Sequence, residues 1–461
     1  MTITLDAPAG TTFDVLRAEL TGSLFTPDEP EYDALVSPWN LAVPMRPAAV
    51  VAVETAADVA ATVHFAGAHG FTAGVQATGH GAERSLAGHL LVVTRGLDEC
   101  TVHPEGWARI GAGVKWATLV AAAAPHGLAG VNGSTTDVGI VGYTTGGGVG
   151  PLARTYGINA DRVRAFEVVT GDGVFRRVTP ELYPDLFFAL RGGKGAAGIV
   201  TAIEMDLIHL RTFYGGAVYF DAVDAARVID RWRTWADELP ELGTTSLVLF
   251  QLPPLPEIPP PLAGRMTLGV RFVWTGDPAE GARLLDQLRA VAPVVLDDAA
   301  VKPYTAIDSV HADPVDPMPV VDPAILLDAF PAEAADRLLA VAGHGSGSPQ
   351  VMVEVRHLGG AYAREGAHPC AFDHRAARFS VLTVGMAVDE DSAAVALAHA
   401  DRLFAALADW DTGGVWPNFG VPHDAVSARR CYTEPTLARL REVVDTYDPH
   451  GVLQAGAYTR A

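Results

Sequence analysis

The sequence is short of lysine and of positive charge. Lysine occurs only at Lys115, Lys194 and Lys302, and 33 lysine and arginine residues stand against 54 acidic residues, which leaves a net charge of −21. A surface this acidic repels nucleic acid and anionic membranes. The balance of charge therefore excludes both as main partners.

Cysteine is also scarce, and long apolar runs are missing. Cys100, Cys370 and Cys431 lie far apart and form no C-x-x-C pair, which excludes a zinc knuckle, a disulfide framework and any metal site built on them. No stretch reaches the roughly 18 apolar residues of a membrane-spanning helix. The first residues lack the basic and apolar regions of a signal peptide. We therefore expect a cytoplasmic protein with reduced thiols.

The chain has more than enough apolar residues for a folded core. About half of its 461 residues are hydrophobic, and this length predicts two domains. From residue 41 strands alternate with helices: Thr55, with Asp58 three residues on, predicts a helix that ends at Gly70, and Asp172-Gly173 predicts a hairpin. Around residues 205–215 the pattern changes to longer strands and helices without glycine-rich loops.

Two glycine-rich segments are the strongest functional signal. The first is Val75–Gly81 (V-Q-A-T-G-H-G), which follows an expected strand, and the second is Val138–Gly150 (V-G-I-V-G-Y-T-T-G-G-G-V-G). Glycine lets backbone N–H groups approach a ligand closely, and rows of such groups hold phosphate oxygens. A bulky diphosphate cofactor would use two such segments.

One histidine stands inside the first segment. A single histidine is usually a surface residue or a satisfied core residue, but His80 lies between Gly79 and Gly81, directly after an expected strand. At that position its ring is presented from a backbone that a ligand can approach closely. In the second segment Gly148-x-Gly150-x-x-Ala153 matches a nicotinamide-dinucleotide fingerprint, but no apolar strand precedes it and Pro151 interrupts it.

Several stretches, in the same order along the chain, resemble the FAD-linked oxidases related to berberine bridge enzyme and 6-hydroxy-D-nicotine oxidase. Gly79-His80 is similar to the flavin-linkage loop of this family. The other similar stretches are Gly133–Gly150 with Ala153–Gly157, Pro184–Gly193 with Gly198–Val200, Arg356–Ala361, Trp416–Phe419 and Tyr447–Pro449.

The resemblance implies an α+β fold with a two-part FAD-binding domain and a substrate domain whose antiparallel sheet roofs the flavin. We expect residues 1–205, joined by 411–461, to form the first domain and 206–410 the second. The implied cofactor is FAD, bonded through His80 to the 8α-methyl group of its isoalloxazine. The implied cofactor-binding residues are Ala77, Thr78, Gly79, His80, Gly81, Ser134, Thr135, Val138, Gly139, Gly142, Tyr143, Gly146, Gly147, Val200 and Asn418.

The sequence departs from the family pattern in two places. Members with two covalent links carry a cysteine near the start of the second segment, where Thr135 or Thr136 stands here, so we expect a single link. Many members have a tyrosine base two residues before the asparagine that matches Asn418, and here that position is Trp416. An indole N–H can only donate, so a simple sugar-alcohol oxidation is in doubt.

Other residues are then candidates for the catalytic base. Along Val351–Leu358, strand alternation places Met352, Glu354 and Arg356 on one face. If that face meets the flavin, burial raises the pKa of Glu354 and the carboxylate can act as base; an ion pair of Glu354 with Arg356 on a solvated face is an equal alternative. Tyr143 is a further candidate, unless it only stacks on the cofactor, and Asn418 would orient rather than ionise.

These observations predict an FAD-dependent oxidase of a small organic molecule, with O2 as second substrate and a setting in bacterial secondary metabolism or catabolism. Hydride would pass to flavin N5, and O2 would reoxidise the flavin to give H2O2. A flavin-holding cyclase, with no simple net oxidation, is the alternative that the loss of the tyrosine mildly favours. A nicotinamide-dependent dehydrogenase is a third hypothesis and rests only on the Gly148 fingerprint.

Overall fold

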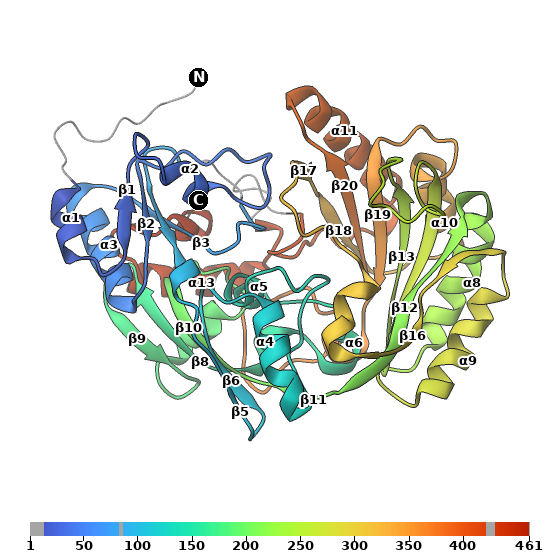
Figure 1. Ribbon diagram of the computed structural model, residues 1–461, viewed down its shortest axis with the longest axis horizontal. Helices are drawn as coiled ribbons and strands as arrows, with labels where there is room; N and C mark the ends of the chain where they lie inside the picture. Colours follow the sequence, from blue (N-terminus) through green and yellow to red (C-terminus); the bar gives the residue numbers. More distant parts are fainter. Residues whose placement is uncertain (1–12, 83–85, 421–428, 461) are drawn as a thin grey trace.

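The computed structural model describes residues 13–82, 86–420 and 429–460. Two smaller sheets lie on one side of the molecule and a large antiparallel sheet on the other (Figure 1). The α+β class expected from the sequence is confirmed. Among the described residues, no helix combines the length and apolar character needed to cross a membrane.

The first small sheet forms early in the chain and has the order β1-β2-β4-β3, in which β2, β4 and β3 run parallel. The predicted capping box is present at the start of α3, where Thr55 and Asp58 cap each other's backbone N–H groups, and Gly70 ends the helix with φ +74°. The elements of this part are α1 (Asp14–Glu19), β1 (Ser23–Phe25), α2 (Tyr32–Val36), β2 (Ala49–Ala52), α3 (Ala56–His69), β3 (Ala73–Gln76) and β4 (Leu90–Val93).

The second small sheet is antiparallel, with the order β5-β6-β10-β8-β9, and includes the predicted hairpin at Asp172-Gly173 between β8 and β9. The glycine-rich segment 138–150 contains a short helix, α5, which sequence analysis did not predict. The elements here are β5 (Cys100–His103), β6 (Trp107–Gly111), α4 (Trp116–Ala123), β7 (Leu128–Ala129), α5 (Ile140–Thr145), α6 (Ala153–Tyr156), β8 (Val163–Thr170), β9 (Phe175–Val178), α7 (Pro184–Leu190), β10 (Gly198–Asp206) and β11 (Ile208–His209).

The large sheet has the order β15-β12-β14-β13-β19-β20-β17, with β16 paired to β12 and β18 to β20. Its outer face packs against helices through large apolar side chains such as Trp232 and Trp235 of α8 (Figure 1). The elements are β12 (Thr212–Asp221), α8 (Ala225–Glu238), β13 (Gly243–Gln251), β14 (Met266–Trp274), α9 (Pro278–Arg289), β15 (Val294–Asp297), β16 (Ala300–Pro303), β17 (Val320–Val321), β18 (Ala324–Leu327), α10 (Ala332–Ala342), β19 (Gln350–His357), β20 (Phe379–Met386) and α11 (Glu390–Ala406).

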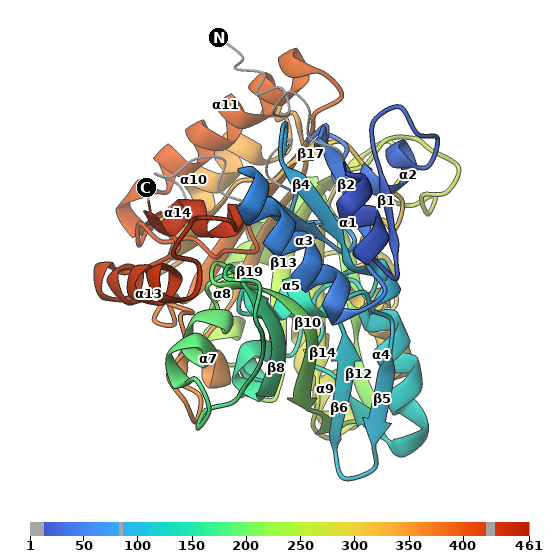
Figure 2. The ribbon, with the colours of Figure 1, turned by 90° about the vertical axis from the view of Figure 1, so that its left-hand side faces the viewer.

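The C-terminal segment runs back to the two small sheets. Helix α13 (Glu434–Tyr447) packs against α7, and α14 (Ala457–Arg460) follows it (Figure 2). Between the two helices the backbone N–H of Ala73, at the start of β3, donates to the carbonyl of Val452 at 2.7 Å. The segment between α13 and α14 therefore lies beside the strand that leads to His80.

Candidate functional site

A large cavity of about 1220 Å³ lies between the small sheets and the inner face of the large sheet. Its walls include both glycine-rich segments, the C-terminal segment and residues of β12, β13, β14, β19 and β20. Ligand pockets for one drug-sized molecule are typically about 300–1,000 Å³. The cavity therefore has room for a large cofactor together with a substrate.

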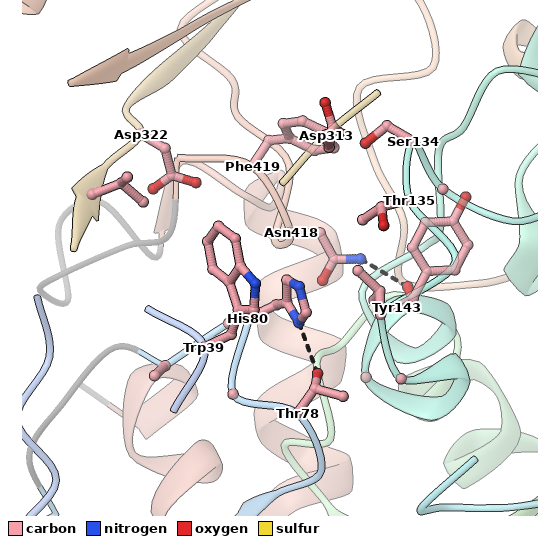
Figure 3. A pocket seen from close by; sticks show the side chains of 18 of the residues that line it. Trp39, Thr78, His80, Ser134, Thr135, Tyr143, Asp313, Asp322, Asn418 and Phe419 are labelled. Carbon is pink, nitrogen blue, oxygen red and sulfur yellow. Dashed lines mark hydrogen bonds between the residues drawn. The ribbon is translucent and has the colours of Figure 1, made fainter. Parts of the chain in front are cut away.

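Strand β3 delivers the first glycine-rich segment to the cavity wall. Gly79 has φ +78°, and a Cβ at this position would lie 2.5 Å from the Cα of Pro38, so only glycine fits this turn. The next residue, His80, is stacked on Trp39 with 4.7 Å between ring centroids (Figure 3). Local backbone geometry thus fixes where the imidazole points.

One nitrogen of His80 has no partner. Nδ1 lies 2.9 Å from Oγ1 of Thr78, whereas the buried Nε2 has no hydrogen-bond partner among the described residues (Figure 3). Burial lowers the pKa of His80 to about 4, so the ring is neutral at physiological pH. A neutral imidazole with one orphaned nitrogen fits a residue that bonds to a ligand in the cavity.

In the second glycine-rich segment, one glycine faces the cavity and others are packed inside the protein. Gly142, in α5, is exposed between buried neighbours, and a Cβ at this position would meet no atom within 4 Å. Gly146 and Gly147 are buried and are not part of the cavity wall: a Cβ would lie 2.1 Å from Asn418 Oδ1 or 2.1 Å from the ring of Phe372. The surface that a ligand can approach closely is therefore at Gly142.

The other expected cofactor-binding residues lie together at the cavity. The wall includes Ala77, Thr78, Gly79, His80, Gly81, Ser134, Thr135, Val138, Gly139, Gly142, Tyr143, Val200 and Asn418. Asn418 is fixed from both ends, because its Nδ2 donates to the carbonyl of Tyr143 at 2.7 Å (Figure 3) and its Oδ1 accepts from Lys194 Nζ at 2.6 Å. Sequence reasoning missed Lys194, although a rare lysine among glycines was a signal; in the structure this residue has φ +55°.

Strand β19 presents the predicted face to the cavity: Met352, Glu354 and Arg356 line it. The environment of Glu354 nevertheless differs from the one expected of a base. Its carboxylate is fully buried and accepts from Arg271 and Arg356, each at 2.7 Å, and from the hydroxyl of Ser246 at 2.8 Å.

This network corrects the expected pKa of Glu354. Desolvation by itself would raise the pKa, but the charges of Arg356 and Arg271 outweigh it and hold the pKa well below its usual range. The alternative of an ion pair with Arg356 describes the site better, except that the pair is buried rather than solvated. A carboxylate stabilised in this way is a weak base.

The other two residues considered for proton transfer are poorly suited to it. Burial raises the pKa of Tyr143, and its buried hydroxyl has no partner among the described residues. Trp416 is buried outside the cavity wall, where its Nε1 donates to the hydroxyl of Tyr362 at 3.1 Å. Trp416, which stands where many members of the family have a tyrosine, thus belongs to a packed core cluster and not to the cavity surface.

Sequence analysis also missed Asp322, which lies in the linker between β17 and β18 and lines the cavity (Figure 3). Burial raises the pKa of Asp322 to about 7, and its own backbone N–H and Lys194 only partly oppose this effect. A carboxyl group with a pKa near neutrality can accept or release a proton at working pH.

The dinucleotide fingerprint around Gly148 has a different setting from the one it requires. Gly148 follows helix α5 instead of a strand, and α6 behind it has only four residues. The carbonyl of Gly148 accepts from the backbone N–H of Asn159 at 2.9 Å, inside the protein. The geometry therefore gives no support to the nicotinamide hypothesis.

Comparisons with known proteins agree with this geometry. Residues 47–179 match the model of the FAD binding domain family. (R)-6-Hydroxynicotine oxidase of Paenarthrobacter nicotinovorans is 29% identical over 308 residues, which is 64% of each chain and so less than two thirds of that relative's length. The FAD-dependent monooxygenase FUP4 of Fusarium proliferatum is 35% identical over 37% of this chain and 34% of its own.

Solved structures share the fold over nearly the whole chain. The crystal structure of 6-hydroxy-D-nicotine oxidase from Arthrobacter nicotinovorans has a TM-score of 0.82 at 23% identity, covering 95% of this chain and 97% of that one. BBE-like 1 of Physcomitrella patens has a TM-score of 0.82 at 18% identity, with 96% and 98% covered.

Residues 47–179 thus match an FAD binding domain, and the whole chain shares the fold of these solved structures. In sequence the chain resembles the 6-hydroxynicotine oxidases, and in fold also the berberine bridge enzyme-like proteins.

Proposed function

We propose that this protein is an FAD-dependent oxidase of a small organic molecule, with the flavin attached once, through His80. The observation that carries the proposal is the cavity in which the orphaned Nε2 of His80, the bare backbone at Gly142 and the inner face of the large sheet meet. We also propose the division expected from the sequence: residues 1–205 and 411–461 hold the cofactor, and 206–410 bind the substrate.

Different segments of the chain would bind the cofactor and orient it. The segments 77–81 and 134–143 hold the diphosphate and the flavin ring, and Asn418, fixed by Lys194 and the carbonyl of Tyr143, orients it. When bound, FAD supplies the acceptor for a hydride and reacts with O2. The substrate loses two electrons and two protons, and O2 takes them up as H2O2.

Apolar side chains line part of the cavity. The half-buried Phe250 and the buried Leu382 of the large sheet lie on one side, and the C-terminal segment lies on another. The neutral ring of His80 keeps a free lone pair available for the covalent bond at physiological pH. We place the enzyme in the cytoplasm and in bacterial secondary metabolism or catabolism, in line with three cysteines that form no disulfide among the described residues.

An absorption spectrum before and after acid precipitation tests the proposal. The purified protein should be yellow, and the colour should stay with the precipitated protein because the flavin is bonded. A colourless protein that takes up no added FAD would contradict the function, and colour found only in the supernatant would contradict the covalent bond.

A second measurement separates oxidation from the cyclase alternative. A peroxide assay with candidate substrates should give one H2O2 for each substrate consumed. Turnover without peroxide would support a reaction with no net oxidation, or one like that of the relatives named monooxygenases, in which oxygen enters the product.

A further inference from the structure

The guanidinium group of Arg356 lies at the cavity wall with unused donors. Arg356 is 9% exposed and lines the cavity, and its Nε donates to Oε2 of Glu354 at 2.7 Å. In the described part of the chain, neither of its two terminal nitrogens has a hydrogen-bond partner. Guanidinium donors at a cavity wall that no protein group satisfies usually face a ligand or ordered water.

The guanidinium group is also held in one orientation. Glu354 fixes it along the Nε edge, and the ring of Phe419 lies under its face, 4.8 Å from the guanidinium carbon to the ring centroid. Because one edge and one face of the guanidinium group are held, its two terminal NH2 groups form a fork whose orientation is fixed before a ligand binds. Such a fork matches the two oxygens of a carboxylate.

The charges around Arg356 leave its positive charge only partly balanced. Glu354 is shared, because its Oε1 accepts from Arg271 at 2.7 Å. Asp313 lies 3.8 Å from Arg271 and is paired with that residue rather than with Arg356. His311, 3.5 Å from Glu354, has its pKa lowered by burial and stays neutral. Glu354 is thus the only one of these two carboxylates that contacts Arg356, and it shares its charge with Arg271.

Further along β19 and its two neighbouring strands, part of the cavity wall is apolar. Met352, Leu382 and Val384 line the cavity from β19 and β20, and Phe250 lines it from β13. These side chains suit a hydrophobic body and offer no partner for a second charged group.

We propose that Arg356 binds a carboxylate of the substrate through its two terminal nitrogens, and that the substrate class is an apolar organic acid. This assignment rests on the proposed function, since it places the acid in the same cavity as the flavin. Arg356 is then a specificity-determining residue, and Glu354 positions it.

The test uses the flavin-loaded protein and three apolar carboxylates, namely benzoate, phenylacetate and octanoate, each compared with its neutral amide. Dissociation constants come from the change in flavin absorbance and from calorimetry. We expect at least one acid to bind tenfold or more tightly than its amide. Arg356→Gln should weaken that acid by about 10- to 100-fold and leave its amide unchanged. Arg356→Lys, which keeps the charge but not the fork, should lie between the two.

The control variant is Arg378→Gln, which removes the same charge beside the same sheet from an exposed ion pair with Asp237, outside the cavity wall. It should bind the acid as the wild type does. Yellow protein that binds no acid better than its amide, or variants of Arg356 that keep the preference, would overturn this inference and leave the proposed function intact. Arg356 variants that change only the flavin spectrum would show that the fork faces the cofactor, which also overturns it. Colourless wild-type protein would overturn the proposed function itself.

Discussion

Gly142, rather than Gly146 or Gly147, is the glycine at which a substitution can test flavin binding. Gly146 and Gly147 are close to Asn418 and Phe372, so substitutions there would disturb packing whether or not a cofactor binds. At Gly142 a side chain would instead extend into free cavity space. A substitution at Gly142 can therefore test whether the cofactor approaches the backbone closely, without causing a steric clash inside the protein.

We predict that Gly142→Ala lowers and Gly142→Val abolishes FAD binding, because the added atoms occupy the space that the cofactor needs. The flavin-to-protein absorbance ratio measures the effect, and circular dichroism checks the fold. Gly67→Ala is the matched control, since this glycine also lies in a helix and is exposed but is not part of the cavity wall. Full flavin content in Gly142→Val would disprove the close approach.

At His80 the prediction concerns the covalent bond. His80→Ala should bind FAD that is released completely on acid precipitation, because the ring nitrogen that forms the bond is gone. His126→Ala, a histidine outside the cavity wall, should retain bonded flavin. Flavin that stays with denatured His80→Ala would move the attachment point elsewhere.

Asp322 gives a pH dependence whose sign can be worked out. Its pKa is about 7 in the folded protein and near the ordinary value of 3.8 when unfolded, so the folded state resists ionisation. Asp322 therefore leaves the free energy of unfolding unchanged below pH 4. It lowers this free energy increasingly between pH 4 and 7, and the loss is complete above pH 7.

Asp322→Asn removes that cost. We expect the variant to match the wild type near pH 4 and to be more stable by roughly 1–4 kcal/mol at pH 8, measured by denaturant unfolding of flavin-free protein across this range. Asp230→Asn, at a 67% exposed side chain, is the control and should show no such divergence. Parallel stability curves for Asp322→Asn and wild type would show that Asp322 has an ordinary pKa.

At the scale of elements, the buried network around Glu354 fixes the register of three strands. Ser246 of β13 and Arg271 of β14 both reach Glu354 on β19, and Arg356 reaches it from the same strand. Removing one partner of a buried ion pair leaves an uncompensated charge, which is strongly destabilising.

We therefore expect Glu354→Gln to lower the free energy of unfolding by about 3–5 kcal/mol, where a catalytic base would have left stability unchanged. Thermal and denaturant unfolding measure this loss. Glu333→Gln is the matched control, because its carboxylate pairs with Arg337 at 2.5 Å with 66% of its side chain exposed, and exposed pairs contribute little. Equal stability of the two variants would show that the network does not hold the sheet together.

At the scale of the whole molecule, the C-terminal segment completes the cavity. The buried carboxylate of Asp448 accepts from the backbone N–H groups of Val452 and Leu453 at 2.7 and 3.1 Å. The turn fixed in this way sets the chain against β3, and Leu453, Gln454 and Ala455 line the cavity.

Asp448→Ala should therefore lower both the melting temperature and the flavin content, although Asp448 itself is not part of the cavity wall. Asp445→Ala, one turn earlier and 71% exposed, should change neither. A variant of Asp448 that melts earlier but keeps full flavin would separate the C-terminal turn from cofactor binding.

Local patterns along the chain were enough for much of the fold. The capping box at Thr55, the hairpin at Asp172-Gly173 and the alternation that turns Glu354 and Arg356 to one face each depend on neighbours only a few residues apart. The same holds for His80, whose setting after a strand and between glycines is local. Ordered short motifs also indicated the resemblance to the FAD-linked oxidases, and the comparisons find the same resemblance.

The ionisation states at the cavity depend on residues that are distant in the sequence. The expected base Glu354 is instead a buried ion-pair partner because Arg271, 83 residues earlier, folds against it from another strand. Asp322 acquires its raised pKa from burial at a wall that no local pattern reveals. Desolvation and charge pairing are properties of the assembled cavity, and so the chemistry of its carboxylates emerges only from tertiary structure.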